Sequence, residues 1–214
     1  MTSPTEQRPV GGEPARAGPL AIEFANTFSA ARGHVYDAVG RPELLVAWLA
    51  SHADELGLDG AAPITETEVR VFVALRDAIR SLCRAVVEAN LREVDQSEAD
   101  EMALLNRAAA GAPRWPTLAG AGGHYRVVER ADGDGLSRAL ATLAQNAIAV
   151  LGGQQRDHLR GCRAPGCLQF FVTDQARRQW CCAACGNRVR ASRHYRRHRK
   201  ASSGAAPAGS GHSR

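Results

Sequence analysis

Apolar residues recur at three- and four-residue steps over most of the first two thirds of the chain, a period that predicts amphipathic helices. Residues 41–56 and residues 137–151 each carry one apolar stripe of this kind. The longest stripe runs over residues 66–92, and Thr65 and Glu68 form a capping-box pattern at its start. The pattern therefore predicts a helical domain built around one long central helix.

The remaining patterned segments are shorter. A helix is expected from Ser97 to near Gly111, and residues 124–135 alternate like a strand that enters a turn, so they predict a hairpin with a neighbouring segment. Residues 21–28 are apolar, but their pattern fits a helix and a strand equally well. Cys83 lies on the apolar face of the long helix and is expected to be a small buried hydrophobic residue.

Changes in composition divide the chain into four parts. Residues 1–19 are rich in Pro and Gly and predict a disordered leader, and residues 201–214 predict a flexible tail. Between them lie a mainly α domain with a minor β-hairpin, over residues 20–155, and a short charged unit over residues 156–200. No apolar run is long enough for a membrane helix, and the N-terminus lacks the apolar core of a secretory signal, so a cytoplasmic protein without membrane contact is expected.

The net charge of +5 is unevenly distributed along the chain. Residues 1–155 hold 14 arginines against 20 acidic residues, a net charge of −6. Residues 156–200 hold 12 cationic residues against two acidic ones, a net charge of +10. An acidic body joined to a basic C-terminal unit suggests two separate tasks in one chain.

Five of the six cysteines lie within this basic unit. Two pairs, Cys162-x4-Cys167 and Cys181-x3-Cys185, are separated by thirteen residues, which is the spacing of a structural zinc site. Four thiolates enclose Zn²⁺ tetrahedrally and leave no position open for a substrate water. A strand near one pair and a helix that begins near Asn187 after the other predict a treble-clef-like finger, whose metal supplies the folding energy that so short a unit lacks.

Other interpretations of the cysteines remain open. A disulfide set is disfavoured in a cytosolic chain, and a redox pair formed by Cys182 and Cys185 lacks the strand that would precede it in a thioredoxin-like fold. A catalytic zinc would need an open position and a general base, for which only His158 is at hand upstream. Spacing alone also leaves open whether Cys181 or Cys182 is the third ligand, although Cys181 is favoured.

The last part of the basic unit is a run of like charge. Residues 187–200 contain seven arginine or lysine residues, two histidines and no acid. Such a run is expected to bind an anionic partner, because an isolated helix of this charge repels itself. Nucleic acid is the favoured partner, ahead of a solvated or protein-facing surface and of membrane phosphates. The expected contacts are Arg178, Arg188, Arg190, Arg193, Arg196, Arg197 and Arg199. DNA is favoured over RNA because the stacking aromatic residues of an RNA-recognition sheet are largely absent.

These residues carry a resemblance to a known family. The stretch RQWCCAACGNR, which follows the first cysteine pair, closely resembles the CGNR zinc finger of bacterial proteins. Upstream, EFANT at residues 23–27, then Asp37 and the segment PELLVAWL, resemble the ABATE domain that accompanies that finger. The resemblance covers about residues 20–200. It implies Zn²⁺ as the cofactor and the four cysteines of the two pairs as its ligands. The chain departs from the family at Cys182, where the family has Ser.

The family resemblance also implies a function. Such proteins are described as stress-induced transcription regulators or as RNA-binding zinc-ribbon-like proteins. The expected function is therefore a zinc-dependent, DNA-binding transcription regulator, whose helical domain forms a homodimer or senses an unknown small-molecule effector. The alternatives are an RNA-binding protein and an adaptor whose finger binds an acidic protein. An enzyme is not expected, because no nucleophile motif or phosphate-binding loop is present.

Overall fold

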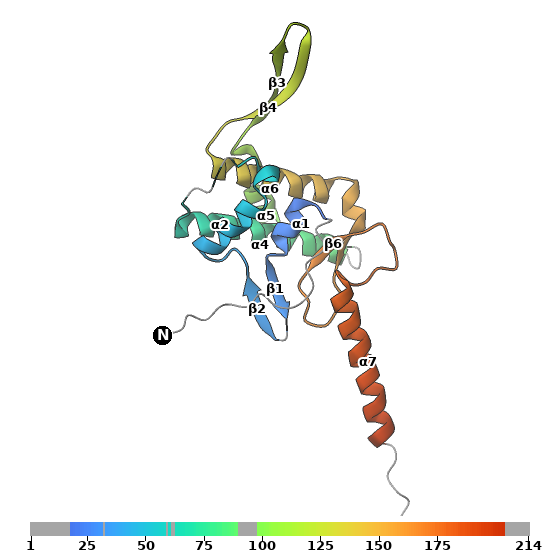
Figure 1. Ribbon diagram of the computed structural model, residues 1–214. Coiled ribbons are helices and arrows are strands. Elements are labelled where there is room, and N and C mark those ends of the chain that lie inside the picture. The colour runs from blue at the N-terminus through green and yellow to red at the C-terminus, as the bar shows by residue number, and fades with distance from the viewer. Residues whose placement is uncertain (1–17, 32, 59, 61–62, 90–97, 204–214) are drawn as a thin grey trace, which may run out of the picture.

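The protein is mainly α-helical, as the apolar periodicity predicts. The structure, a computed structural model, describes residues 18–203 except 32, 59, 61–62 and 90–97, and within the last helix it describes side chains as far as Tyr195. Among these residues, the N-terminal part forms six helices (Figure 1): α1 (Leu20–Ala25), α2 (Pro42–Ser51), α3 (Ala53–Leu56), α4 (Glu66–Ala89), α5 (Ala99–Ala110) and α6 (Gly135–Gly152). The segment whose pattern fitted either helix or strand is α1 followed by the start of a strand.

The core lies around α4, which packs against α1, α5 and α6. Its apolar stripe places Phe72 and Ile79 out of contact with solvent, and the ring of Phe72 meets the edge of Phe24 at 6.4 Å between centroids. Each such side chain contributes about 2–3 kcal/mol by leaving water. Cys83 is fully buried on the same stripe, as predicted, and this burial raises the pKa of its thiol to about 12. Cys83 is therefore an inert core residue.

Hydrogen bonds from side chains fix where the helices begin and break. The capping box at α4 is confirmed: Thr65 donates its amide N–H to Glu68 at 2.6 Å, and Glu68 donates its own to Thr65 Oγ1 at 3.3 Å. Asp134 accepts the amide N–H of Ser137, so α6 begins at Gly135, two residues before the predicted start. The single helix predicted over residues 41–56 is instead two helices, because the backbone leaves helical geometry at His52. Ser97, the predicted cap of α5, lies outside the described residues.

Three antiparallel hairpins join the helices: β1 (Phe28–Ala31) with β2 (His34–Asp37), β3 (Arg114–Ala121) with β4 (His124–Ala131), and β5 (Leu159–Gly161) with β6 (Phe170–Val172). The predicted strand is β4, and its unpredicted partner is β3. This second hairpin projects from the helical body (Figure 1), and its turn passes through Gly122 and Gly123, both at positive φ.

The C-terminal part leads from a short 3-10 helix (Gln154–His158) through the third hairpin to α7 (Ala183–Ser203), which extends away from the body (Figure 1). Leu159 and Phe170 of this hairpin belong to the main core. The C-terminal unit is therefore stabilised by packing against the helical domain as well as by its own few apolar residues. Residues 201–203, predicted as flexible tail, are the end of α7; the rest of that tail and the first 17 residues of the predicted leader lie outside the described part of the chain. None of the described helices is both long and apolar enough to cross a membrane.

Candidate metal centre and nucleic-acid interface

Four cysteine sulfurs meet at the junction between the third hairpin and α7. The Sγ atoms of Cys162, Cys167, Cys181 and Cys185 all lie within 4.8 Å of one another. The distance is 3.6 Å between Cys181 and Cys185, 3.8 Å between Cys167 and Cys185, and 3.9 Å between Cys167 and Cys181. The structure thus brings together the four residues that the sequence singles out.

Two local structures present the two pairs. Cys162 directly follows β5 and Cys167 stands shortly before β6, so the first pair forms the end of a hairpin. The chain reverses between them at Gly166, whose φ of +71° favours glycine, and Cys167 donates its amide N–H to the carbonyl of Ala164 at 3.0 Å. In the second pair, Cys181 precedes α7 and Cys185 lies in its first turn.

The predicted start of the last helix was wrong by four residues. Asn187 was expected to cap it, but α7 begins at Ala183 and Asn187 lies inside the helix. Its side chain accepts a hydrogen bond from Arg190 at 2.5 Å instead. The helix therefore starts between the two cysteines of the second pair, and its positive N-terminal end points toward the cluster of sulfurs.

The sulfur positions fit a tetrahedral cation. With four metal–sulfur bonds of about 2.3 Å, regular tetrahedral geometry separates the sulfurs by about 3.8 Å. The three distances above lie within 0.2 Å of that value. Cys182 also lies near, with its Sγ atom 3.9 Å from that of Cys181, but it is not among the four that converge. The geometry thus favours Cys181 over Cys182.

The thiols cannot all ionise without a cation. The pKa of Cys162 lies far below its usual range because the side chains of Cys167 and then Cys181 donate hydrogen bonds to it. The pKa values of Cys167 and Cys181 are raised in turn, first of all because their protons are held in those bonds to Cys162. Burial raises the pKa of Cys185 to about 12. A divalent cation would remove this conflict, because it stabilises every thiolate at once.

The three residues that follow Cys185 support the cluster in different ways. Arg188 points a guanidinium nitrogen at Cys185 Sγ from 3.7 Å, where it would offset the charge of a metal-bound thiolate. Gly186 is buried, and its Cα faces the ring of Trp180 so closely that an added Cβ would lie 3.2 Å from that ring. The guanidinium of Arg190, which binds Asn187, lies 5.9 Å from the centre of the same ring. Glycine here lets Trp180 close over the start of α7.

Replacing Gly186 by Ala should therefore loosen the finger. The new methyl group would force Trp180 or Arg190 outward by a few tenths of an ångström, an overpacking that typically costs about 1–3 kcal/mol. We expect faster release of bound metal to a chelator and a shift in the Trp emission spectrum. Gly152, whose added Cβ would meet no atom within 4 Å, provides the matched control. Identical metal release in both alanine variants would contradict this role of Gly186.

The arginines predicted to contact nucleic acid differ in their surroundings. Arg188, Arg190 and Arg193 are exposed on α7. Arg178 instead donates to the carbonyls of Trp180 and Cys181, at 3.1 and 2.6 Å, and stacks over Phe171. It therefore braces the loop that carries the second cysteine pair. Arg196, Arg197 and Arg199 lie on α7, but their side chains are outside the described ones.

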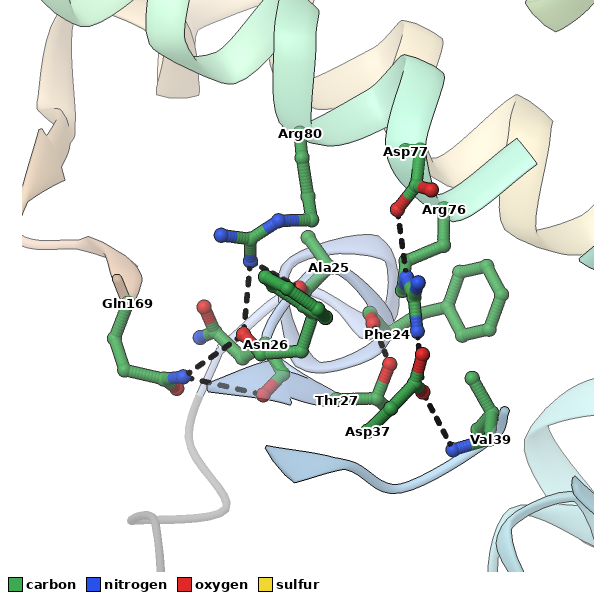
Figure 2. A network of polar contacts seen from close by, with 11 residues as sticks. Phe24, Ala25, Asn26, Thr27, Asp37, Val39, Arg76, Asp77, Arg80 and Gln169 are labelled. Atoms are coloured by element: carbon green, nitrogen blue, oxygen red, sulfur yellow. Dashed lines mark hydrogen bonds and ion pairs between the residues drawn. The ribbon is translucent and has the colours of Figure 1, made fainter. Parts of the chain in front are cut away.

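A polar clamp fixes the hairpin of the finger to the helical domain. Asn26, at the end of α1, donates to the carbonyl of Phe170 and accepts its amide N–H, both at 2.8 Å. Gln169 donates to the carbonyl of Asn26 at 3.2 Å, and Figure 2 shows it reaching toward the turn after α1. Arg80, from α4, donates to the carbonyl of Leu168 at 3.1 Å. The cysteine-bearing hairpin is thus held from one side by α1 and α4.

Sequence analysis missed most of this clamp. Asn26 is the C-cap residue of α1, and its side chain pairs with the backbone of Phe170, far along the chain. Arg76 and Arg80 follow Phe72 at steps of four residues, so both lie on the apolar stripe of α4. An arginine in this position is the one feature of the sequence that indicates a buried polar contact here. Two other polar side chains, from α6 and α1, also have structural roles. Asn146 accepts the amide N–H of Ala21 at 2.9 Å, and Glu23 lies 3.3 Å from the His52 ring.

Comparison with known families agrees with this architecture. Residues 18–154 match the ABATE family, described as "Putative stress-induced transcription regulator", and residues 158–198 match the CGNR zinc finger. The chain belongs to the ABATE family. It carries the CGNR zinc finger at its C-terminal end, as the sequence resemblance implied. No curated protein matches the chain.

Proposed function

We propose that this ABATE protein is a zinc-dependent nucleic-acid-binding protein, and more specifically a DNA-binding transcription regulator. The observation that carries the proposal is the position of the four-sulfur cluster at the start of α7. A metal bound there fixes the base of a helix whose exposed face is arginine-rich and which stands clear of the body (Figure 1). The helical domain would then serve regulation, by dimerising or by binding an effector.

Zinc fits the donor set better than other common ions. Four thiolates are soft ligands, and the tetrahedral separation of the sulfurs suits Zn²⁺, which has no geometric preference of its own. Cys162, Cys167, Cys181 and Cys185 would fill all four positions, leaving none for a substrate. The bound ion would therefore act as a structural cross-link between the hairpin and α7, which supports a binding protein rather than an enzyme.

The charge of α7 supports an anionic partner. The described arginines of its exposed face, Arg188, Arg190 and Arg193, are accompanied by further arginines toward Ser203, and no acid lies on this helix. A single projecting helix has the width that the major groove of duplex DNA admits. Most of the arginines would contact phosphates, which orient the protein without reading sequence. Arg190, which binds Asn187 and lies 5.9 Å from the centre of the Trp180 ring, would contribute less than Arg193.

The test is the salt dependence of binding by the full chain. We expect tight binding to a short DNA duplex that weakens steeply with salt, and we expect Arg193→Gln to reduce the log–log slope by about 0.9 and the affinity roughly fivefold. Fluorescence anisotropy of a labelled duplex measures both. Arg70→Gln, an exposed arginine on α4, is the matched control.

Other outcomes would favour the alternatives. Preference for an RNA of the same sequence would favour the RNA-binding function. Absence of nucleic-acid binding in zinc-loaded protein, together with binding to an acidic peptide, would support the adaptor and overturn this proposal.

A further inference from the structure

One buried arginine contacts both parts of the chain. The Arg80 side chain is 6% exposed and lies between the end of α1 and the hairpin of the finger. Figure 2 shows Arg80 reaching toward Ala25, to whose carbonyl it donates at 2.6 Å, and it also donates to the carbonyl of Phe28 at 3.1 Å. On the other side it donates to the carbonyl of Leu168 at 3.1 Å. The rings of Phe28 and Phe170 lie 5.1 and 5.5 Å from its guanidinium carbon.

The charge of Arg80 has no carboxylate partner among the described residues. Arg76, one turn earlier, forms ion pairs with both Asp37 and Asp77. Arg80 bonds only to carbonyl oxygens, and Arg84, one turn later, forms no ion pair within the described part of the chain. A buried charge is costly unless an opposite charge lies near, so Arg80 calls for a nearby anion. Arg84 is exposed and adds a second positive charge on the same side of α4.

Part of the cysteine cluster and these two arginines line one pocket. An open pocket of about 190 Å³ lies beside the contact between α4 and the finger, and it is lined by Arg80, Arg84, Val87, Gly161, Cys162, Cys167, Leu168, Gln169 and Phe170. Two of the four cysteines, Cys162 and Cys167, therefore line the same pocket as both arginines. Once four thiolates bind one Zn²⁺, the centre carries a net charge of about −2. Arg188 is the one cation of α7 that points at a cluster sulfur in the described structure, so most of that charge is left to other groups.

We propose that Arg80 and Arg84 are the counter-charges of the metal centre, so that the helical domain directly sets how tightly the finger holds its metal. The inference rests on the proposed zinc site. Arg80 acts as a positioning residue that also holds the hairpin in place, whereas Arg84 acts through its charge alone. By thermodynamic reciprocity, metal in the finger strengthens the docking of its hairpin on α4 as much as docking strengthens metal binding. A partner that changes the structure at the end of α1 or of α4 would then change how tightly the finger holds its metal.

The experiment measures zinc release from the full chain to a coloured chelator, in low and in high salt. Arg80→Gln is expected to speed release or weaken affinity by roughly 10- to 100-fold, the usual effect of losing a group that supports metal ligands. Arg84→Gln should speed release about two- to fivefold and Arg84→Glu more, because an exposed charge acts weakly through solvent. High salt should abolish the Arg84 effects and leave the Arg80 effect largely intact. Arg70→Gln should match the unchanged protein.

A purely structural role of α4 would give another result. Arg80→Gln could then lower stability, but both Arg84 variants would release zinc at the rate of the unchanged protein in low salt, and that outcome overturns the proposal. Arg80→Lys adds a second readout, since it keeps the charge but not the bonds to three carbonyls. We expect it to recover part of the affinity. Unchanged protein that lacks stoichiometric zinc would refute the proposed function itself, whereas zinc-loaded protein indifferent to Arg80 and Arg84 would refute this inference alone.

Discussion

Replacing Cys185 with Ser is expected to abolish both stoichiometric zinc binding and the affinity of the protein for nucleic acid. The Cys185 sulfur lies 3.6 Å from that of Cys181 and 3.8 Å from that of Cys167, so it joins the hairpin pair to the helix pair. A hydroxyl is a poor zinc ligand, and structural zinc sites contribute about 10–16 kcal/mol to the folding of small domains. Without the ion, the small core of Ala164, Cys185 and Val189 has little else to hold it.

The matched control is Cys182→Ser, which changes the same atoms three residues away. Its sulfur lies outside the four that converge, so this variant should keep one zinc per chain and bind nucleic acid as before. Elemental analysis and anisotropy measure the two properties. Far-UV circular dichroism should show that the helices of the N-terminal part persist in Cys185→Ser, because their core contains no cysteine of the cluster. Equal loss of zinc in both variants would contradict the ligand set.

Sequence analysis predicted the features that depend on local spacing. The four cysteines, the capping box of Thr65 and Glu68, and the stripe of α4 all follow from residues close together in the chain, where period and spacing limit the geometry. The start of α7 was misplaced because the residue before it is Cys182, whose Sγ accepts the amide N–H of Cys185, and not one of the usual Ser, Thr, Asp or Asn caps. Asn187 is one of these usual cap residues, but it lies inside the helix.

The clamp was missed because its partners are far apart in the sequence. Asn26 and Phe170 are separated by 144 positions, and Arg80 and Leu168 by 88. Nothing in the local pattern tells which carbonyl a buried guanidinium will meet. An arginine on an otherwise apolar stripe indicates only that some polar partner must be found. The consequence for function is that the finger was predicted as a separate unit, whereas Phe170 and Leu159 pack into the main core.

The second large effect is expected at the other buried arginine of α4. Asp37→Asn should destabilise the protein by about 2–3 kcal/mol, because it leaves Arg76 as a buried charge with only part of its compensation. Arg76 is 2% exposed, and its guanidinium lies 2.5 Å from Asp37 and 2.9 Å from Asp77. Asparagine has the same shape as aspartate and can still accept the amide N–H of Val39. The loss of stability therefore measures the effect of the charge and not of the packing. Urea unfolding of the full chain measures the difference.

The reverse change at this pair should cost less. Arg76→Met removes the buried cation and fills the same space, while Asp37, whose side chain is 31% exposed, can be stabilised by water, so about 1 kcal/mol is expected. The double variant should then be more stable than the sum of the two single losses predicts. Asp77→Asn is the control: its carboxylate is 58% exposed, and the expected cost is about 0.5 kcal/mol. Equal losses in Asp37→Asn and Asp77→Asn, or additive losses in the double variant, would show that Asp37 does not stabilise the protein through the charge of Arg76.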